Sequence, residues 1–340
     1  MLKPSLSGAP VSSLEDMLAP LPKYRAKQIF AWINAGAGAF DLMTNLPRSL
    51  RNELDERFCL RKTSVINSFE DNSGGAVKLQ ISIEGGIIEA VALVDAAGRR
   101  TACLSTQLGC AMGCVFCKTG GMGFKRNLDS SEITEQFYHI RDLYPDVANI
   151  VFMGMGEPLH NLSGLRQAVS TLCETSSQRR ITVSTCGITE GIMSLADEGP
   201  AVRLAVSLTT AREALRRKLM PVSSANPLNS LKEALLYHQE RHRRRITLEA
   251  VALGGVNTSD EDAAAMAGFA RGLSVVVNLI PWNPVENLLF EGKALKEPSA
   301  AELKRFRAAL EARGLKTVLR REKGRGIAGA CGQLGATENV

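Results

Sequence analysis

From residue 101 onward, short apolar runs rich in β-branched residues alternate with longer segments in which apolar residues recur every three or four positions. Because a strand followed by a helix returns the chain beside the strand it left, this alternation predicts a parallel sheet covered by helices. Six such units fall short of the eight that close a full barrel, so we predict a partial, open (βα)6 barrel of the α/β class. The expected strands are residues 101–106, 149–154, 180–185, 203–208, 246–253 and 274–280, with a last one at 316–321. The expected helices are residues 130–144, 162–174, 188–198, 228–242 and 299–314.

The first 95 residues follow a different pattern, in which two amphipathic helices precede three short strands. The helices are expected at residues 24–36 and 46–58, and the strands at residues 62–69, 76–83 and 87–94. We therefore predict three parts along the chain. They are a small α+β accessory domain at residues 1–95, a core at residues 96–324 and a flexible, glycine-rich tail at residues 325–340.

The composition is ordinary for a soluble globular protein, with 45% hydrophobic and 22% charged residues among 340. No segment approaches the ~20 apolar residues that span a bilayer, and the N-terminus lacks the apolar run of a signal peptide. We therefore expect a cytoplasmic protein whose thiols stay reduced, so clustered cysteines indicate metal binding or catalysis. The net charge of +6 favours polyanionic partners.

Cys110, Cys114 and Cys117 follow the first expected barrel strand with the spacing C-x3-C-x2-C. Loops after the strands of such barrels carry the chemistry. Three thiolates from one loop can hold an iron–sulfur cluster and leave one iron open to bind a small molecule. The alternative is a zinc site whose fourth ligand lies elsewhere, and the spacing favours the cluster without excluding zinc. Neither site explains Cys103, seven residues upstream.

Eight sequence blocks, taken together and in order, resemble the RlmN/Cfr family of radical S-adenosylmethionine (SAM) RNA adenine methyltransferases. The blocks are YRAKQIFAWI, FDLMTNLPRSLR, CLSTQLGCAMGCVFC, GFKRNL, FMGMGEPL, VSTCGI, LIPWNP and ACGQL, between residues 24 and 335. Any one of them is weak evidence, whereas the ordered set is specific and covers nearly the whole chain. The resemblance implies that the expected barrel is a radical SAM barrel.

The resemblance implies one [4Fe-4S] cluster, held by Cys110, Cys114 and Cys117, with SAM on the open iron. Glu157 is expected to accept hydrogen bonds from the SAM amino group, and glycines beside it would let the backbone approach the ligand closely. The SAM contacts that the family implies are Gly156, Glu157, Ser184, Ser207, Leu208, Thr209 and Asn283. Without the resemblance, such residues are more often turn or capping residues.

The resemblance also gives roles to the two remaining cysteines of interest. In the family, a tail cysteine, here Cys331, takes a methyl group from one SAM, and a second SAM yields a radical that abstracts hydrogen from the S-methyl group. The resulting carbon radical adds to adenine, whose electron-poor amidine carbon cannot act as the nucleophile of ordinary methyl transfer. Release of the product requires a second thiol to attack the sulfur of Cys331, and the resemblance places Cys103 in this role, with a transient disulfide.

Glu89 matches the family's proposed acceptor of the proton from the substituted adenine carbon. Strand alternation places Glu89 on one face with apolar neighbours, where burial would raise the pKa of its carboxyl group and suit a base. The alternative is an edge-strand glutamate in water.

The partners implied are RNA, namely 23S ribosomal RNA and in some members tRNA, and an electron donor such as flavodoxin or ferredoxin. Basic clusters at residues 216–220, 241–245 and 320–327 are candidates for phosphate contacts, although such runs are more often solvated helix faces. We expect a monomer without membrane association.

Three features depart from the family pattern. The tail GRGIAGAC lacks the usual acidic residues, Thr209 stands where histidine or asparagine is common, and residues 287–300 form a longer loop than usual. FMGMGEPL and LIPWNP resemble the branch that methylates adenine C2, whereas KLMP resembles the C8 branch. We expect C2, with C8 or an unidentified RNA as the alternative. An iron–sulfur assembly factor that binds RNA without catalysis, and a zinc-dependent RNA-binding protein, remain alternatives of another class.

Overall fold

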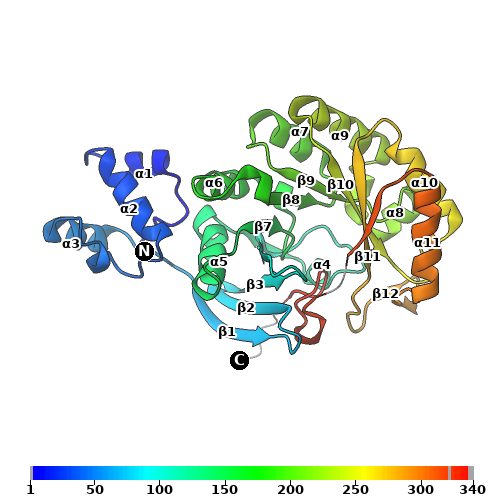
Figure 1. Ribbon diagram of the computed structural model, residues 1–340, viewed down its shortest axis with the longest axis horizontal. Helices are drawn as coiled ribbons and strands as arrows, with labels where there is room; N and C mark the ends of the chain where they lie inside the picture. The colour runs from blue at the N-terminus through cyan, green and yellow to red at the C-terminus, as the bar shows by residue number, and fades with distance from the viewer. Residues whose placement is uncertain (1–2, 321–322, 336–340) are drawn as a thin grey trace.

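The computed structural model describes residues 3–320 and 323–335. Its main feature is a ten-stranded sheet in the order β1-β2-β3-β4-β7-β8-β9-β10-β11-β14, with β1 and β14 at the two open edges (Figure 1). Strands β1 to β4 pair antiparallel, and from β4 onward every pairing is parallel. The open, partly parallel barrel that the sequence predicts is therefore confirmed.

All seven strands expected after residue 100 are present. They are β4 (Arg100–Cys103), β7 (Asn149–Phe152), β8 (Ile181–Thr185), β9 (Arg203–Ser207), β10 (Ile246–Ala252), β11 (Val275–Pro281) and β14 (Thr317–Leu319). The helices between or after them are α5 (Ser130–Leu143), α6 (Leu162–Cys173), α7 (Thr189–Glu198), α8 (Glu213–Leu219), α9 (Leu228–His242), α10 (Asp260–Ala270) and α11 (Ala300–Ala312). Sequence reasoning did not name α8 and α10. Helix α10 begins with a capping box in which Ser259 and Asp262 bind each other's backbone N–H groups.

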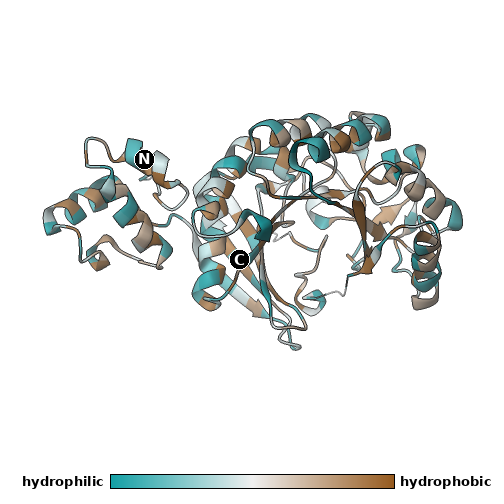
Figure 2. Cartoon of the chain, turned by 45° about the horizontal axis from the view of Figure 1, so that its top comes forward, coloured by the Kyte–Doolittle hydropathy of each residue, from teal (hydrophilic) through white to brown (hydrophobic). Residues whose placement is uncertain are grey.

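The helices cover the convex side of the sheet, and their apolar faces point inward. Figure 2 shows hydrophobic strands at the centre and hydrophilic outer faces on the helices around them. Strand β10 is buried along most of its length, as expected for a central parallel strand that is covered on both faces. The core thus leaves the carboxyl ends of the strands free to form a site.

The N-terminal part contains α1 (Val11–Met17), α2 (Tyr24–Asn34), α3 (Arg48–Arg57), β1 (Ser64–Glu70), β2 (Ala76–Ile83) and β3 (Gly86–Val94). The three helices form a lobe beside the barrel (Figure 1). Strand β3 pairs with β4, so the expected boundary near residue 95 falls in a turn between neighbouring strands of one sheet. The N-terminal strands are therefore an extension of the barrel wall.

Glu135 joins the helical lobe to the barrel. This residue of α5 is fully buried, and its carboxylate accepts hydrogen bonds from the hydroxyls of Ser5 (2.8 Å), Ser7 (2.7 Å) and Thr63 (2.7 Å). The backbone N–H groups of Lys62 (3.0 Å) and Thr63 (2.8 Å) donate to it as well. One side chain of the barrel thus fixes both ends of the lobe.

Shorter elements complete the described chain. They are β5 (Gln107–Gly109), β6 (Phe124–Asn127), β12 (Leu289–Phe290), β13 (Lys293–Ala294), α4 (Lys118–Gly121), and the 3-10 turns η1 (Phe40–Leu42), η2 (Pro158–His160), η3 (Gln178–Arg180), η4 (Pro221–Ser224) and η5 (Arg325–Ile327). Across residues 3–320 and 323–335, no helix has the length and apolar character needed to cross a membrane.

Candidate active site

A cavity of about 900 Å³ opens at the carboxyl ends of the parallel strands. The predicted site residues that line it are Cys110, Cys114, Cys117, Gly156, Glu157, Ser184, Ser207, Asn283 and Cys331. The structure therefore brings together side chains that lie more than 200 residues apart in the sequence. Leu208 and Thr209 are fully buried and do not line the cavity.

The loop that carries the three cysteines is held from several directions. The N–H of Cys110 donates to Gly123 O (2.9 Å), and the N–H of Val115 donates to Leu219 O (3.0 Å). The indole N–H of Trp282 donates to the carbonyl of Phe116 between the second and third cysteines (2.9 Å). Phe116, Trp282 and the cysteines belong to a second apolar cluster, which shields the loop from water.

The chemistry of the three thiols fits the ligands of an iron–sulfur cluster. The thiols line one cavity, and burial raises the pKa of each, to about 12 for Cys110. A bound iron would offset that cost because it binds the thiolate form.

Glu157 is held rigidly at the edge of the cavity. Its carboxylate accepts hydrogen bonds from the N–H of Leu159 (3.0 Å) and from the N–H of Cys186 (2.7 Å), which follows β8. Burial raises the pKa of Glu157, against the lowering effect of these N–H groups. Its remaining lone pairs are available to an ammonium donor, as expected for the SAM amino group.

Gly156 was expected to let the backbone approach the SAM ligand, but its close contact in the structure is with Gln107. The φ of Gly156 is +97°, and a Cβ atom here would lie 2.5 Å from Cβ of Gln107. Gln107 Oε1 also accepts the N–H of Glu157 (2.8 Å). The close contact is therefore with the strand that precedes the cysteine loop, and the glycine fixes the position of Glu157.

Glu249 is a cavity residue that sequence reasoning missed. It lies on β10, is 3% exposed and lines the cavity, and its Oε2 accepts the hydroxyl of Ser184 (2.7 Å). Its Oε1 has no hydrogen-bond partner among the described residues. A buried carboxylate oxygen without a partner is costly, so it marks a ligand position. The sequence contained a pattern that could have identified Glu249, because this acidic residue interrupts an otherwise mostly apolar strand.

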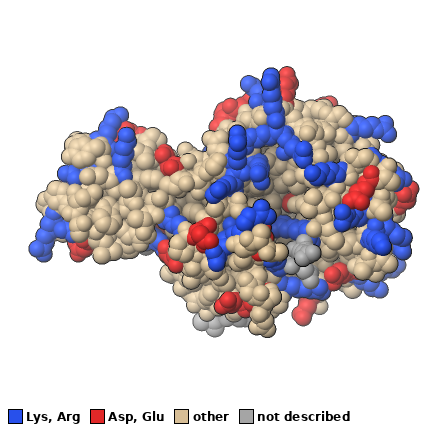
Figure 3. All heavy atoms as spheres, viewed as in Figure 1, with Lys and Arg blue, Asp and Glu red and all other residues tan. Residues whose placement is uncertain are grey.

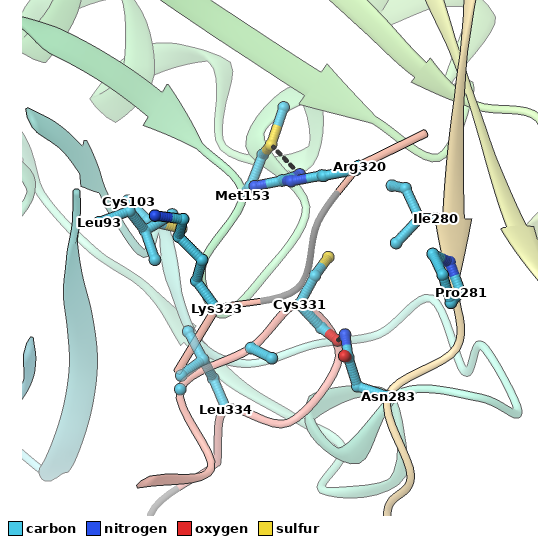
Figure 4. Close-up of a pocket in the computed structure, with 12 residues that line it drawn as sticks. Leu93, Cys103, Met153, Ile280, Pro281, Asn283, Arg320, Lys323, Cys331 and Leu334 are labelled. Carbon is cyan, nitrogen blue, oxygen red and sulfur yellow. Dashed lines mark hydrogen bonds between the residues drawn. The ribbon is translucent and has the colours of Figure 1, made fainter. Parts of the chain in front are cut away.

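Cys331 lies where this cavity meets a second one. The second cavity, about 600 Å³, is lined by Cys103, Arg320 and Lys323 as well as Cys331. Figure 4 shows the Cys331 sulfur pointing into the space between Cys103 and the β11 residues Ile280 and Pro281. The two thiols that the sequence placed 228 positions apart thus face one cavity.

The thiols of this second cavity are poorly hydrated. Protein atoms surround the sulfur of Cys331 although the residue is accessible from the cavity, and this desolvation raises its pKa to about 11. Burial raises the pKa of Cys103 to about 12, and the proximity of Cys331 adds to the shift. The guanidinium of Arg320 lowers both values and is the main local cation that favours the thiolates.

The described part of the tail is docked. Thr119 Oγ1 donates to Leu334 O (2.6 Å), Lys118 N–H to Gly332 O (2.8 Å), and Asn283 Nδ2 to Cys331 O (3.0 Å). Residues 336–340 of the expected tail lie outside the described residues. The flexibility that the glycines suggested is thus countered by specific hydrogen bonds across residues 330–335.

Glu89 is not an edge-strand residue in water. It lies on the interior strand β3, is 2% exposed and forms an ion pair with Lys78 on β2 (Nζ to Oε1, 3.0 Å). Its Oε2 accepts the N–H of Gly335 in the tail (2.7 Å). The carboxylate expected to act as a base is therefore adjacent to the tail that carries Cys331, although it lines neither cavity.

Comparisons with known proteins agree with this arrangement. Residues 104–267 match the Radical SAM superfamily, and residues 8–60 match the ribosomal RNA large subunit methyltransferase N-terminal domain. A probable dual-specificity RNA methyltransferase RlmN of Treponema pallidum is 43% identical over 99% of this chain and 98% of its own length. This chain belongs to the RlmN family of radical SAM RNA methyltransferases.

A second relative and a solved structure extend the similarity. The corresponding RlmN of Treponema denticola is 45% identical, covering 98% of this chain and 96% of that protein. The crystal structure of a radical SAM methyltransferase from Sphaerobacter thermophilus superposes with a TM-score of 0.91 at 37% identity, covering 97% and 99% of the two chains. As an RlmN-family protein, the chain uses SAM and an iron–sulfur cluster to methylate RNA.

The basic clusters that were expected to contact RNA lie in different environments in this RlmN-family structure. Arg216 is fully buried and donates to the carbonyls of Ser207 (3.0 Å) and Cys186 (2.8 Å), so it supports the cavity wall. Arg241 pairs with Asp197 (2.8 Å) on the outer face of the helices. Arg321 and Glu322 of the third cluster lie outside the described residues.

Proposed function

We propose that this protein methylates a ring carbon of adenine, C2 in preference to C8, in 23S ribosomal RNA and in tRNA. The observation that carries the proposal is the position of Cys331, which lines both the cavity of the cysteine loop and the cavity of Cys103. A thiol at this junction can receive a methyl group on one side and be attacked by a second thiol on the other. The dual-specificity activity in the names of the Treponema relatives supports two RNA classes.

Cys110, Cys114 and Cys117 would hold the cluster, and SAM would lie against Gly156, Glu157, Ser184, Ser207 and Asn283. Leu208 and Thr209, which the family pattern also implies, would only support the wall behind Ser207. When bound, the cluster and SAM supply the methyl group and the one-electron chemistry, with two SAM per turnover and an electron from a donor such as flavodoxin or ferredoxin. Glu157 and the Ser184–Glu249 pair would orient SAM from two strands of the sheet. The apolar cluster around Phe116 and Trp282 would exclude water.

Cys331 would accept the methyl group and then carry the carbon that bonds to adenine. Glu89 would accept the proton of the substituted carbon, which requires its carboxylate to leave the N–H of Gly335 while Lys78 keeps it oriented. Cys103 would then attack the sulfur of Cys331, which leaves a disulfide and frees the methylated RNA. We propose that the enzyme acts as a cytoplasmic monomer.

Nucleoside mass spectrometry after anaerobic incubation tests the proposal. The reconstituted protein is mixed with SAM, dithionite, and 23S RNA and tRNA from a host that lacks the modification. We expect 2-methyladenosine, and a Cys331→Ala variant that produces none. If 8-methyladenosine forms instead, the regiochemistry is wrong. If no methyladenosine forms and Cys331 carries no methyl group while the cluster is intact, the reaction itself is wrong.

A further inference from the structure

A groove of about 1580 Å³ lies outside the two catalytic cavities. Its walls are α8, the turn that follows β10 and the β12–β13 hairpin. The hairpin lies within residues 287–300. Four cations line the groove, and Glu291 is the acid among its lining residues. The cations are Arg212, Lys218, Lys293 and Lys296.

The charges of this groove are only partly neutralised. Lys218 forms an ion pair with Glu291 (2.6 Å), and Arg212 lies 3.4 Å from Asp262. Lys293 and Lys296 are exposed, and neither has an acidic partner within the part of the chain that the structure describes. The hairpin wall therefore presents two uncompensated positive charges to whatever enters the groove.

The floor of the groove is apolar and its wall is fixed. Leu215, Val256 and the partly exposed Phe290 form the floor. The N–H of Gly254 donates to Lys296 O (2.8 Å), which ties the hairpin to the end of β10. Aromatic rings beneath lysine-lined walls are the usual combination in sites for single-stranded nucleic acid, where bases stack and cations follow the phosphates.

The groove adjoins the active site. Phe290 and Leu295 pack in the same apolar cluster as Cys110 and Phe116 of the cysteine loop. Met220, which follows α8, lines the main cavity, while Lys218 of the same helix lines the groove. On the face shown in Figure 3, Lys and Arg side chains gather around the central hollow, so the approach to the site is basic.

We propose that this groove binds the single-stranded backbone of the substrate RNA beside the target adenine, with phosphates on Lys293 and Lys296 and a base on Phe290. The proposal rests on the proposed function, because an adenine that reaches the cavity must leave its stack and so brings single-stranded neighbours with it. The β12–β13 hairpin thereby adds an RNA contact next to the site.

The test compares two double charge reversals of equal size. The groove variant is Lys293→Glu with Lys296→Glu, and the control is Lys304→Glu with Lys316→Glu, two exposed lysines on or after α11. The probe is a fluorescein-labelled, adenine-containing 20-nucleotide single-stranded RNA, bound by the reconstituted protein at several salt concentrations. The plot of log K against log salt has a negative slope, and each lost phosphate contact makes it shallower by about 0.7. The slope of the groove variant should therefore be shallower than that of the wild type by about 1.4. The groove variant should also bind the RNA at least tenfold more weakly at low salt.

S-methylation of Cys331 without RNA, measured by mass spectrometry, shows that each variant is folded and chemically competent. Equal slopes for the groove variant and the control overturn the groove assignment even if the wild type methylates RNA. If the groove variant binds RNA normally but loses binding to a ribosomal protein, the groove is a protein surface and the assignment is wrong. If the slope becomes shallower as expected while the wild type methylates no RNA, the groove assignment holds and the proposed reaction fails.

Discussion

Gly156 illustrates how a single residue is fixed by packing. Its backbone adopts φ +97°, and the atoms of Gln107 occupy the space that a side chain would need. Gly121 has no atom within 4 Å of its Cβ position and no positive φ, so it provides a matched control. Of the two glycines, Gly156 lines the cavity and sets the position of the Glu157 carboxylate.

We expect Gly156→Ala to lower the free energy of unfolding by about 2–4 kcal/mol, because it adds backbone strain to overpacking. We expect Gly121→Ala to change it by less than about 1 kcal/mol. Urea denaturation followed by circular dichroism measures both. A Gly156→Ala protein as stable as the Gly121→Ala protein would show that the contact with Gln107 relaxes easily.

At the scale of elements, the tail depends on a few hydrogen bonds that residues far away in the sequence provide. Thr119 on α4 donates its hydroxyl to Leu334 O, and this bond is buried. The docked tail places Cys331 at the junction of the cavities. Under the proposed function, methyl transfer to Cys331 therefore depends on the position of the tail. A change at Thr119 should therefore affect Cys331 without touching it.

We expect Thr119→Val to raise amide hydrogen exchange of residues 330–335 about fivefold, since a buried hydrogen bond of this type contributes about 1 kcal/mol. The rate of Cys331 S-methylation should fall with it. Thr119→Ser keeps the hydroxyl and should behave as wild type. Faster exchange in the serine variant as well would mean that the methyl group of Thr119, and not its hydroxyl, holds the tail.

Helix α9 carries a buried histidine with a predictable effect on acid stability. Burial, with smaller contributions from His242 and Arg244, lowers the pKa of His238 to about 4. Below the unfolded value of about 6.5 the unfolded chain binds a proton that the folded chain does not, so stability falls as the pH decreases from 6.5 toward 4.

When the pH falls from 7 to 5, the free energy of unfolding of the wild type should decrease because of His238. In the His238→Leu protein this decrease should be smaller by about 2 kcal/mol, because the variant lacks the titrating group. Urea denaturation at both pH values provides the comparison, and the other titrating groups cancel because they are common to the two proteins. Equal losses would show that His238 takes up its proton in the folded state.

At the scale of the whole molecule, the helical lobe is attached to the barrel through Glu135. Five donors from residues 5–63 converge on this one carboxylate. An amide at this position would place an NH2 group against N–H and O–H donors. The chain has two tryptophans, Trp32 in the lobe and Trp282 in the barrel, so each part has its own probe.

We expect Glu135→Gln to lower stability by about 2–4 kcal/mol, with the Trp32 signal lost at lower urea than the Trp282 signal. Trp32→Phe and Trp282→Phe backgrounds separate the two emissions. Glu174→Gln, an exposed residue after α6, serves as the control and should change little. Coincident transitions in the Glu135→Gln protein would contradict a separate attachment of the lobe.

The sequence by itself determined the order of strands and helices. The spacing of apolar residues differs between a strand and a helix, and each spacing persists over many residues. It also identified the cysteine loop and, through the resemblance of eight ordered blocks, the family. Missed helices such as α8 and α10 are short or weakly amphipathic, so their periodicity is faint. These local signals depend on neighbours in the chain, which a sequence displays directly.

The tertiary structure alone decided what each site residue meets. It placed Cys331 between two cavities, paired Glu89 with Lys78, buried Arg216 in the cavity wall and left Leu208 and Thr209 outside the cavity lining. It also showed that Gly156 approaches Gln107 and that Glu249 has an oxygen without a partner. Most of these contacts join residues that are dozens to hundreds of positions apart, and no local pattern encodes them because they arise only when the sheet brings its strand ends together.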